Sequence, residues 1–165
     1  MKFNCRPVGI EFLDNAPVQF VNQVELAASP AQVFAIFEKA EAWPLWYKEI
    51  VKVEWHGPQP YGVGTTRTVK LTTVTVEEHF FVWEQNERLA FCFTAMSLPL
   101  VHALVEEYRL TPLGEHRSQF TYKVGLELSF WLRLGGPLIL KVYEKMFRQA
   151  TTNLAEYILN QPVIP

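Results

Sequence analysis

The chain has 165 residues, a formal net charge of −2, and 49% hydrophobic against 19% charged residues. This length suits a single domain with a sizeable core, and the composition argues against intrinsic disorder. Lysine and arginine form no basic tract that would neutralise phosphates, so nucleic acid is not an expected partner.

The cysteines and histidines give no pattern of a disulfide framework or a metal site. Cys5 and Cys92 are far apart, and no His or Cys pair has metal-ligand spacing with a third ligand nearby. We therefore expect no metal and no cofactor. The first 17 residues lack the continuous apolar block of a signal peptide, and no window approaches the roughly 20 apolar residues of a membrane span. These features predict a cytoplasmic protein.

The first predicted elements are a strand and two short helices. Residues 18–26 alternate between apolar and polar side chains, as a half-buried strand does. Ser29 and Pro30 then supply a helix N-cap and a first helical residue. Trp43 and Pro44 introduce a bend, and we expect a second short helix there because Leu-Trp-Tyr follows and needs burial.

The remaining chain predicts a sheet followed by one long helix. Segments rich in valine, threonine and aromatic residues predict strands at 50–55, 65–73, 74–83, 88–95, 104–110 and 118–128. After Gly135 and Gly136 the apolar period becomes helical and continues over 138–159. The pattern predicts an α+β fold with about six to seven antiparallel strands and a long C-terminal helix.

Several local motifs carry a family resemblance. They are Ala-Ser-Pro-Ala-Gln-Val-Phe at 28–34, Trp-Pro-Leu-Trp at 43–46, Gly-Val-Gly-Thr at 62–65, and Glu78 five residues before Trp83. With the order of elements, they make the chain resemble the START-like superfamily, also called SRPBCC or polyketide cyclase/dehydrase-like. The resemblance implies a helix-grip fold, in which a curved sheet wraps the long helix around an apolar cavity. It predicts one START-like ligand-binding domain at residues 18–160 and an N-terminal extension at 1–17, which is an added strand, a lid or a tail.

Arg67 and Glu78 are the first candidates for ligand binding. Arg67 shares a strand face with Val69 and Leu71, and an arginine on an apolar face needs an anion or hydrogen-bond acceptors. It can pair with Glu78 from the adjoining strand, or hold a carboxylate, ketone or phenolate of a ligand. We favour the internal ion pair.

A second polar set follows on a later strand. His102, Glu106 and Tyr108 share a strand phase with Leu104. If this face points inward, they form a polar line that could orient or protonate a bound carbonyl, with His102 or Glu106 as the proton carrier. The alternative is that they are solvated rim residues. The other predicted wall residues are aromatic: Phe80, Phe91, Phe120, Tyr122 and Phe147.

Trp131 lies in an apolar connection just before Gly135 and Gly136. One interpretation is a first helical turn packed on the sheet. The other is a mobile gate that opens the cavity to solvent or to a membrane surface, with transient membrane contact.

Three functions follow from the resemblance. The favoured one is binding, for sequestration or transport, of a small apolar molecule such as a lipid, an isoprenoid or an aromatic polyketide. The second is a polyketide cyclase or dehydratase that uses the same cavity, and the third is a modulator of a protein partner. The sequence leaves open whether the protein is an enzyme, and whether it is a monomer or a homodimer.

Overall fold

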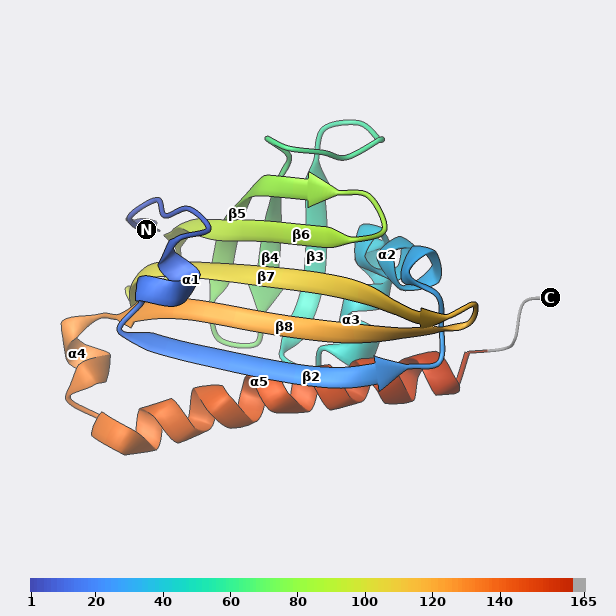
Figure 1. The fold of residues 1–165 in the computed structure, drawn as a ribbon. Coiled ribbons are helices and arrows are strands. Elements are labelled where there is room, and N and C mark those ends of the chain that lie inside the picture. The colour runs from blue at the N-terminus through green and yellow to red at the C-terminus, as the bar shows by residue number, and fades with distance from the viewer. Residues whose placement is uncertain (162–165) are drawn as a thin grey trace.

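The computed structural model describes residues 1–161, in which a long helix lies across one face of a curved antiparallel sheet (Figure 1). The strands are β1 (Phe3–Asn4), β2 (Val18–Leu26), β3 (Ile50–His56), β4 (Thr66–Leu71), β5 (Thr75–Glu84), β6 (Arg88–Met96), β7 (Val101–Gly114) and β8 (Arg117–Leu128). The helices are α1 (Phe12–Asn15), α2 (Pro30–Glu38), the 3-10 helix η1 (Ala40–Ala42), α3 (Trp43–Trp46), α4 (Phe130–Arg133) and α5 (Gly136–Leu159). This arrangement confirms the predicted α+β helix-grip fold, with its short helices after strand β2.

The sheet runs in the order β2-β8-β7-β6-β5-β4-β3, and the short strand β1 pairs with β6. All strand pairs are antiparallel. β2 lies beside β8, in register from Val18 opposite Leu126 to Leu26 opposite Ser118. The continuous path therefore has the predicted number of strands, and β1 adds an eighth from the N-terminal extension.

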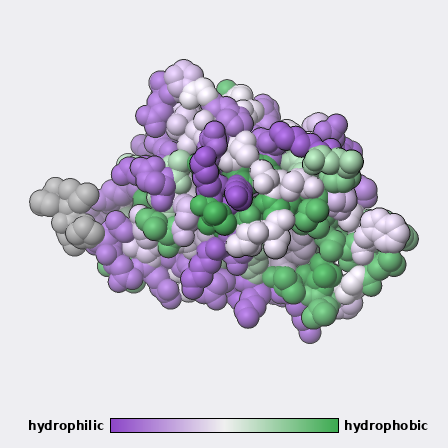
Figure 2. Space-filling model, turned by 180° about the vertical axis from the view of Figure 1, so that it is seen from behind, coloured by the Kyte–Doolittle hydropathy of each residue, from purple (hydrophilic) through white to green (hydrophobic). Residues whose placement is uncertain are grey.

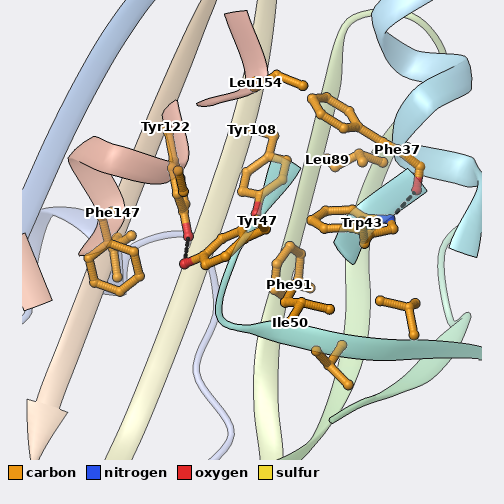
Figure 3. Close-up of a cluster of buried hydrophobic side chains, with 14 of the residues drawn as sticks. Phe37, Trp43, Tyr47, Ile50, Leu89, Phe91, Tyr108, Tyr122, Phe147 and Leu154 are labelled. Atoms are coloured by element: carbon orange, nitrogen blue, oxygen red, sulfur yellow. Dashed lines mark hydrogen bonds between the residues drawn. The ribbon is translucent and has the colours of Figure 1, made fainter. Parts of the chain in front are cut away.

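The short helices have specific anchors at their ends. Ser29 accepts a hydrogen bond from the backbone N–H of Gln32, whose side chain accepts one from the backbone N–H of Ser29. This capping box fixes where α2 begins. Trp43 Nε1 donates to the carbonyl oxygen of Phe37 at 2.9 Å, which ties the start of α3 to the end of α2 (Figure 3). α3 in turn contacts β3 and α5, so it closes part of the space between sheet and helix.

Only the second half of α5 is deeply packed. Its buried apolar side chains begin at Phe147 and continue with Ala150, Leu154 and Ile158. In the first half, Leu138 and Val142 are 70% and 58% exposed. The sheet therefore grips the C-terminal half of the helix, while the N-terminal half borders a space that the core does not fill. No helix among residues 1–161 is long and apolar enough to cross a membrane.

The N-terminal segment covers the outer face of the sheet. Phe12 and Leu13 of α1 form a small apolar cluster with Val105, separate from the main core. Gly125 of β8 allows this close approach, because a Cβ added there would lie 2.9 Å from the carbonyl oxygen of Phe12. Residues 1–17 are thus packed against the domain, with β1 as an added strand and α1 as a cover.

We expect Gly125→Ala to push α1 away from the sheet and lower the free energy of unfolding by about 1–3 kcal/mol, as overpacking does. Gly62→Ala is the matched control, because an added Cβ there meets no atom within 4 Å. Urea denaturation of both variants measures the difference. Equal unfolding midpoints would contradict the close packing of α1 on β8.

Candidate functional site

A cavity of about 320 Å³ lies between the sheet, α3 and the first half of α5. Most of its wall is apolar and comes from both layers, with Val69, Val76 and Leu104 on the strands and Ile139 and Met146 on the helix. The polar side chains in the wall are few. Such a concave apolar site with a small number of polar groups is typical of small-molecule binding.

Arg67 and Glu78 are one polar feature of this wall. They are directly opposed on β4 and β5, and Arg67 Nε donates to Glu78 Oε2 at 2.5 Å. Their side chains are only 2% and 5% exposed. The structure thus confirms the predicted ion pair. Burial raises the pKa of Glu78, and the positive charge of Arg67 opposes that rise.

Aromatic rings surround the Arg67 guanidinium. Its carbon lies 4.2 Å from the ring centroid of Trp43 and 5.0 Å from that of Trp55. Phe80 and Phe91 approach it at 5.1 and 5.0 Å. These cation–π contacts help to stabilise a charge that has little access to water. Arg67 Nη1 has no hydrogen-bond partner among the described residues.

Glu106 is the second buried carboxyl in the wall. Its Oε2 accepts hydrogen bonds from Tyr122 at 2.7 Å and from Tyr108 at 3.3 Å. The hydroxyl of Tyr47 lies 3.4 Å from that of Tyr122, and Figure 3 shows these two hydroxyls pointing toward each other. The set joins β7, β8 and the end of α3 by hydrogen bonds at the cavity.

Burial raises the pKa of Glu106 to about 8, and the negative charge of Glu78 adds to this rise. The hydrogen bonds from Tyr122 and Tyr108 and the charge of Arg67 oppose it without cancelling it. Burial also raises the pKa of Tyr47, Tyr108 and Tyr122, so these phenols keep their protons. At neutral pH the cavity wall therefore holds a carboxylic acid beside neutral hydroxyl groups.

The structure brings together most of the predicted site residues. The cavity is lined by Arg67, Glu78, Glu106, Tyr108 and Phe147. Tyr122 is linked to it by its hydrogen bond to Glu106. Phe80, Phe91 and Phe120 are fully buried, but they belong to the aromatic core rather than to the cavity lining.

Two predicted residues lie elsewhere. His102 is exposed, because the strand register shifts between Val101 and Ala103 and both of these neighbours are buried. A bulge of this kind reverses the face on which the following side chains lie. For His102 the structure thus agrees with the alternative of a solvated residue, and of the two proton carriers considered only Glu106 faces the cavity. Trp131 is 74% exposed on α4, so it neither packs on the sheet nor lines the cavity.

Sequence reasoning missed Trp43 and Tyr47 as parts of the site. Both line the cavity, and both come from the segment in which only a bend and a short helix were predicted. The available signal for Tyr47 was the expected burial of Leu-Trp-Tyr, which the structure shows for Trp46 and Tyr47 but not for Leu45, which is exposed. Among residues 1–161, no group of three His, Cys, Asp or Glu side chains is placed to hold a metal ion.

Exposed apolar side chains surround one approach to the cavity. We define the mouth surface as five exposed residues on α4, the adjoining turn and the start of α5: Phe130, Trp131, Leu134, Leu138 and Val142. Val142 also lines the cavity, so the two features are continuous. Figure 2 shows hydrophobic surface gathered at the end of the molecule where these elements lie.

Comparison with known proteins places this geometry in a family. The family model described as polyketide cyclase/dehydrase and lipid transport matches residues 17–158. The chain belongs to this family. It is 41% identical over 109 residues to the uncharacterized proteins Rv2574 of Mycobacterium tuberculosis (strain ATCC 25618 / H37Rv) and Mb2604 of Mycobacterium bovis (strain ATCC BAA-935 / AF2122/97). That match covers 66% of this chain and 65% of the length of each relative.

Solved structures share the fold at low sequence identity. A START superfamily protein from Mycobacterium smegmatis superposes with a TM-score of 0.73 at 15% identity, covering 86% of this chain and 97% of that one. The di-domain ARO/CYC protein BexL from the BE-7585A biosynthetic pathway gives a TM-score of 0.70 at 12% identity, covering 86% of this chain and 46% of BexL. These likenesses agree with the family assignment and concern the fold alone.

The raised pKa of Glu106 makes stability depend on pH in a defined direction. Between about pH 4.5 and about pH 8 this carboxyl is ionised in the unfolded chain but protonated in the folded one. The unfolded state is therefore favoured progressively as pH rises through this range. The effect of this single group is on the order of 5 kcal/mol across the range.

We expect Glu106→Gln to remove this dependence, because the amide accepts the same tyrosine hydrogen bonds and does not titrate. Urea denaturation at about pH 5 and about pH 8 measures it. The variant should gain stability relative to the wild-type protein as pH rises. A constant difference between the two proteins at both pH values would contradict the raised pKa.

Proposed function

We propose that this protein binds one small, mainly apolar molecule in the cavity between the sheet and α5. The observation that carries the proposal is an apolar cavity that holds a buried ion pair and a buried carboxyl in its wall. The family description, which includes lipid transport and polyketide cyclisation, supports the same class of ligand. Lipids, isoprenoids and aromatic polyketides are the candidate classes.

The size and lining of the cavity narrow this choice. A volume of about 320 Å³ is at the small end of the roughly 300–1,000 Å³ found for ligand sites. It suits a ring system or a short isoprenoid better than a two-chain lipid. Burial of apolar ligand area contributes about 25 cal/mol per Å² before the entropic costs of binding, so most of the affinity comes from the apolar wall. The polar groups then orient the ligand.

We expect protein purified from a cellular host to carry a small molecule that solvent extraction releases and that native mass spectrometry detects as an adduct. Leu104→Trp should abolish the adduct, because Leu104 lines the cavity and an indole would fill it. Val21→Trp is the control, since Val21 is 60% exposed on β2 and does not line the cavity. Circular dichroism establishes that both variants fold. An adduct of unchanged occupancy in folded Leu104→Trp would contradict binding in this cavity.

We also propose that the ligand enters and leaves while the mouth surface rests on an anionic membrane. This surface exposes large apolar side chains, including Trp131 at 74% exposure, beside the cavity. Arg133 and Lys141 lie among its residues along the chain and are exposed, and no acidic residue lies between Ser129 and Tyr143. Apolar side chains flanked by basic ones fit the boundary between headgroups and acyl chains of an anionic bilayer.

We expect the protein to co-sediment with vesicles containing phosphatidylglycerol more strongly than with vesicles of phosphatidylcholine alone. Leu138→Ser should weaken this binding several-fold, because it removes apolar area from the contact. Val21→Ser is the matched control, since Leu138 and Val21 are 70% and 60% exposed but lie in different parts of the molecule. Equal losses in the two variants would contradict docking through the mouth surface. Self-association without vesicles would instead assign this surface to a second copy of the chain.

A further inference from the structure

The hydrogen bonds around Glu106 all run toward one of its oxygen atoms. The hydroxyls of Tyr108 and Tyr122 both donate to Oε2. Since a phenol has a single proton and that of Tyr122 is already given to Glu106, Tyr47 is the donor in its contact with Tyr122. Two hydrogen-bonded paths thus converge on Oε2, one from Tyr47 through Tyr122 and one directly from Tyr108.

Oε1, the other carboxyl oxygen of Glu106, has no hydrogen bond to a side chain or backbone group of residues 1–161. A carboxylic acid carries its proton on one oxygen, and an oxygen that accepts two hydrogen bonds is the less suitable place for it. The proton of a neutral Glu106 therefore belongs on Oε1. Glu106 lines the cavity, so the Oε1–H group is a hydrogen-bond donor at its wall. A ligand atom that accepts a hydrogen bond is the natural partner for this group.

Burial first, and the charges around it second, keep Glu106 in its neutral form. Arg67 is directly paired with Glu78, which leaves Glu106 without a cation of its own. Glu78 adds negative charge nearby, and Glu106 itself is only 6% exposed. The remaining titratable groups at the cavity are Glu49 from the segment before β3 and Tyr143 from α5, and neither supplies a positive charge. A buried carboxyl in such surroundings keeps its proton at neutral pH.

We propose that Glu106 selects the ligand by donating a hydrogen bond from Oε1 to a carbonyl oxygen, so that the cavity prefers a ketone to a hydrocarbon of the same shape. This inference rests on the proposed binding function and names the polar group of its ligand. A carbonyl oxygen accepts hydrogen bonds and needs no acceptor in return, which matches a site whose available group is a donor. A carboxylate ligand would place a further negative charge beside Glu78 and Glu106, with Arg67 as the one cation lining the cavity in the described part of the chain.

Two probes of nearly equal shape isolate this hydrogen bond. They are 2-acetonaphthone, an aryl ketone, and 2-isopropenylnaphthalene, in which a carbon–carbon double bond replaces the carbonyl. The ratio of their dissociation constants, measured by equilibrium dialysis, cancels most of the contribution of apolar burial. Wild-type protein should favour the ketone at about pH 6, and this preference should fall about tenfold at about pH 9.5, where Glu106 is ionised.

Variants of two carboxyl groups in the cavity wall show which of them causes the ketone preference. In Glu106→Gln the ketone preference should persist at both pH values, because the amide N–H replaces the acid as donor and does not titrate. In Glu106→Leu the preference should be absent at both. Glu49→Gln is the matched control, since Glu49 also lines the cavity, and it should behave like the wild-type protein. Circular dichroism at each pH establishes that the proteins are folded.

The outcomes separate this inference from the proposed function. If both probes bind the wild-type protein without a ketone preference, or if Glu106→Gln keeps the wild-type pH dependence, Glu106 does not select the ligand and the binding function stands. If neither probe binds wild-type protein that holds no other molecule in its cavity, the binding function and this inference both fail. Loss of the ketone preference in Glu49→Gln would assign the selection to Glu49 instead of Glu106 and overturn the inference.

Discussion

The central constraint on this molecule is the balance of charge inside its cavity. One guanidinium, Arg67, meets two deeply buried carboxyl groups, Glu78 and Glu106. Burying an uncompensated charge is far more costly than burying a neutral acid, so only one of the two carboxyls can be ionised with a partner. Arg67 on β4 pairs directly with Glu78 on β5, so Glu106 has no paired cation and stays a neutral carboxylic acid. The rings that surround the guanidinium and the phenols that surround Glu106 then complete a polar layer within an aromatic interior.

The cavity itself results from the way in which α5 is held. The sheet grips the helix from Phe147 onward, and α3 packs against both β3 and α5. The aromatic core formed by Phe37, Trp43 and Tyr108 fills the end of the domain near α2 and α3. The first half of α5 borders the cavity instead, through Ile139, Val142 and Tyr143. Because the sheet grips only the C-terminal half of α5, the apolar side chains of α4 and the start of α5 are exposed at the mouth of the cavity.

Strand alternation, the Ser29-Pro30 helix start and the helical period after Gly136 are local signals, and they were sufficient to predict the α+β class and the order of elements. The helix-grip arrangement of these elements was predicted from the family resemblance. The sequence was also sufficient for the Arg67–Glu78 pair, because two regular neighbouring strands place both residues on the apolar face. The face of His102 stayed open, because a register shift beside it leaves no mark in the pattern of residues. Tyr47 was missed for a different reason. Its contact with Tyr122 joins residues 75 positions apart through a short helix, and no local pattern encodes such a pairing.

An apolar cavity and a buried, neutral Glu106 both lower the stability of the empty protein. A cavity forfeits packing contacts, and a carboxyl with a raised pKa favours the unfolded chain at neutral pH. A sequence that served stability alone would fill the space with larger side chains and replace Glu106 with an apolar residue. A molecule that fills the cavity and accepts a hydrogen bond from Glu106 would offset these losses, because a ligand that binds only the folded state stabilises it more as its concentration rises above its dissociation constant. The features that weaken the empty domain are therefore the same ones to which we assign ligand binding and ligand choice.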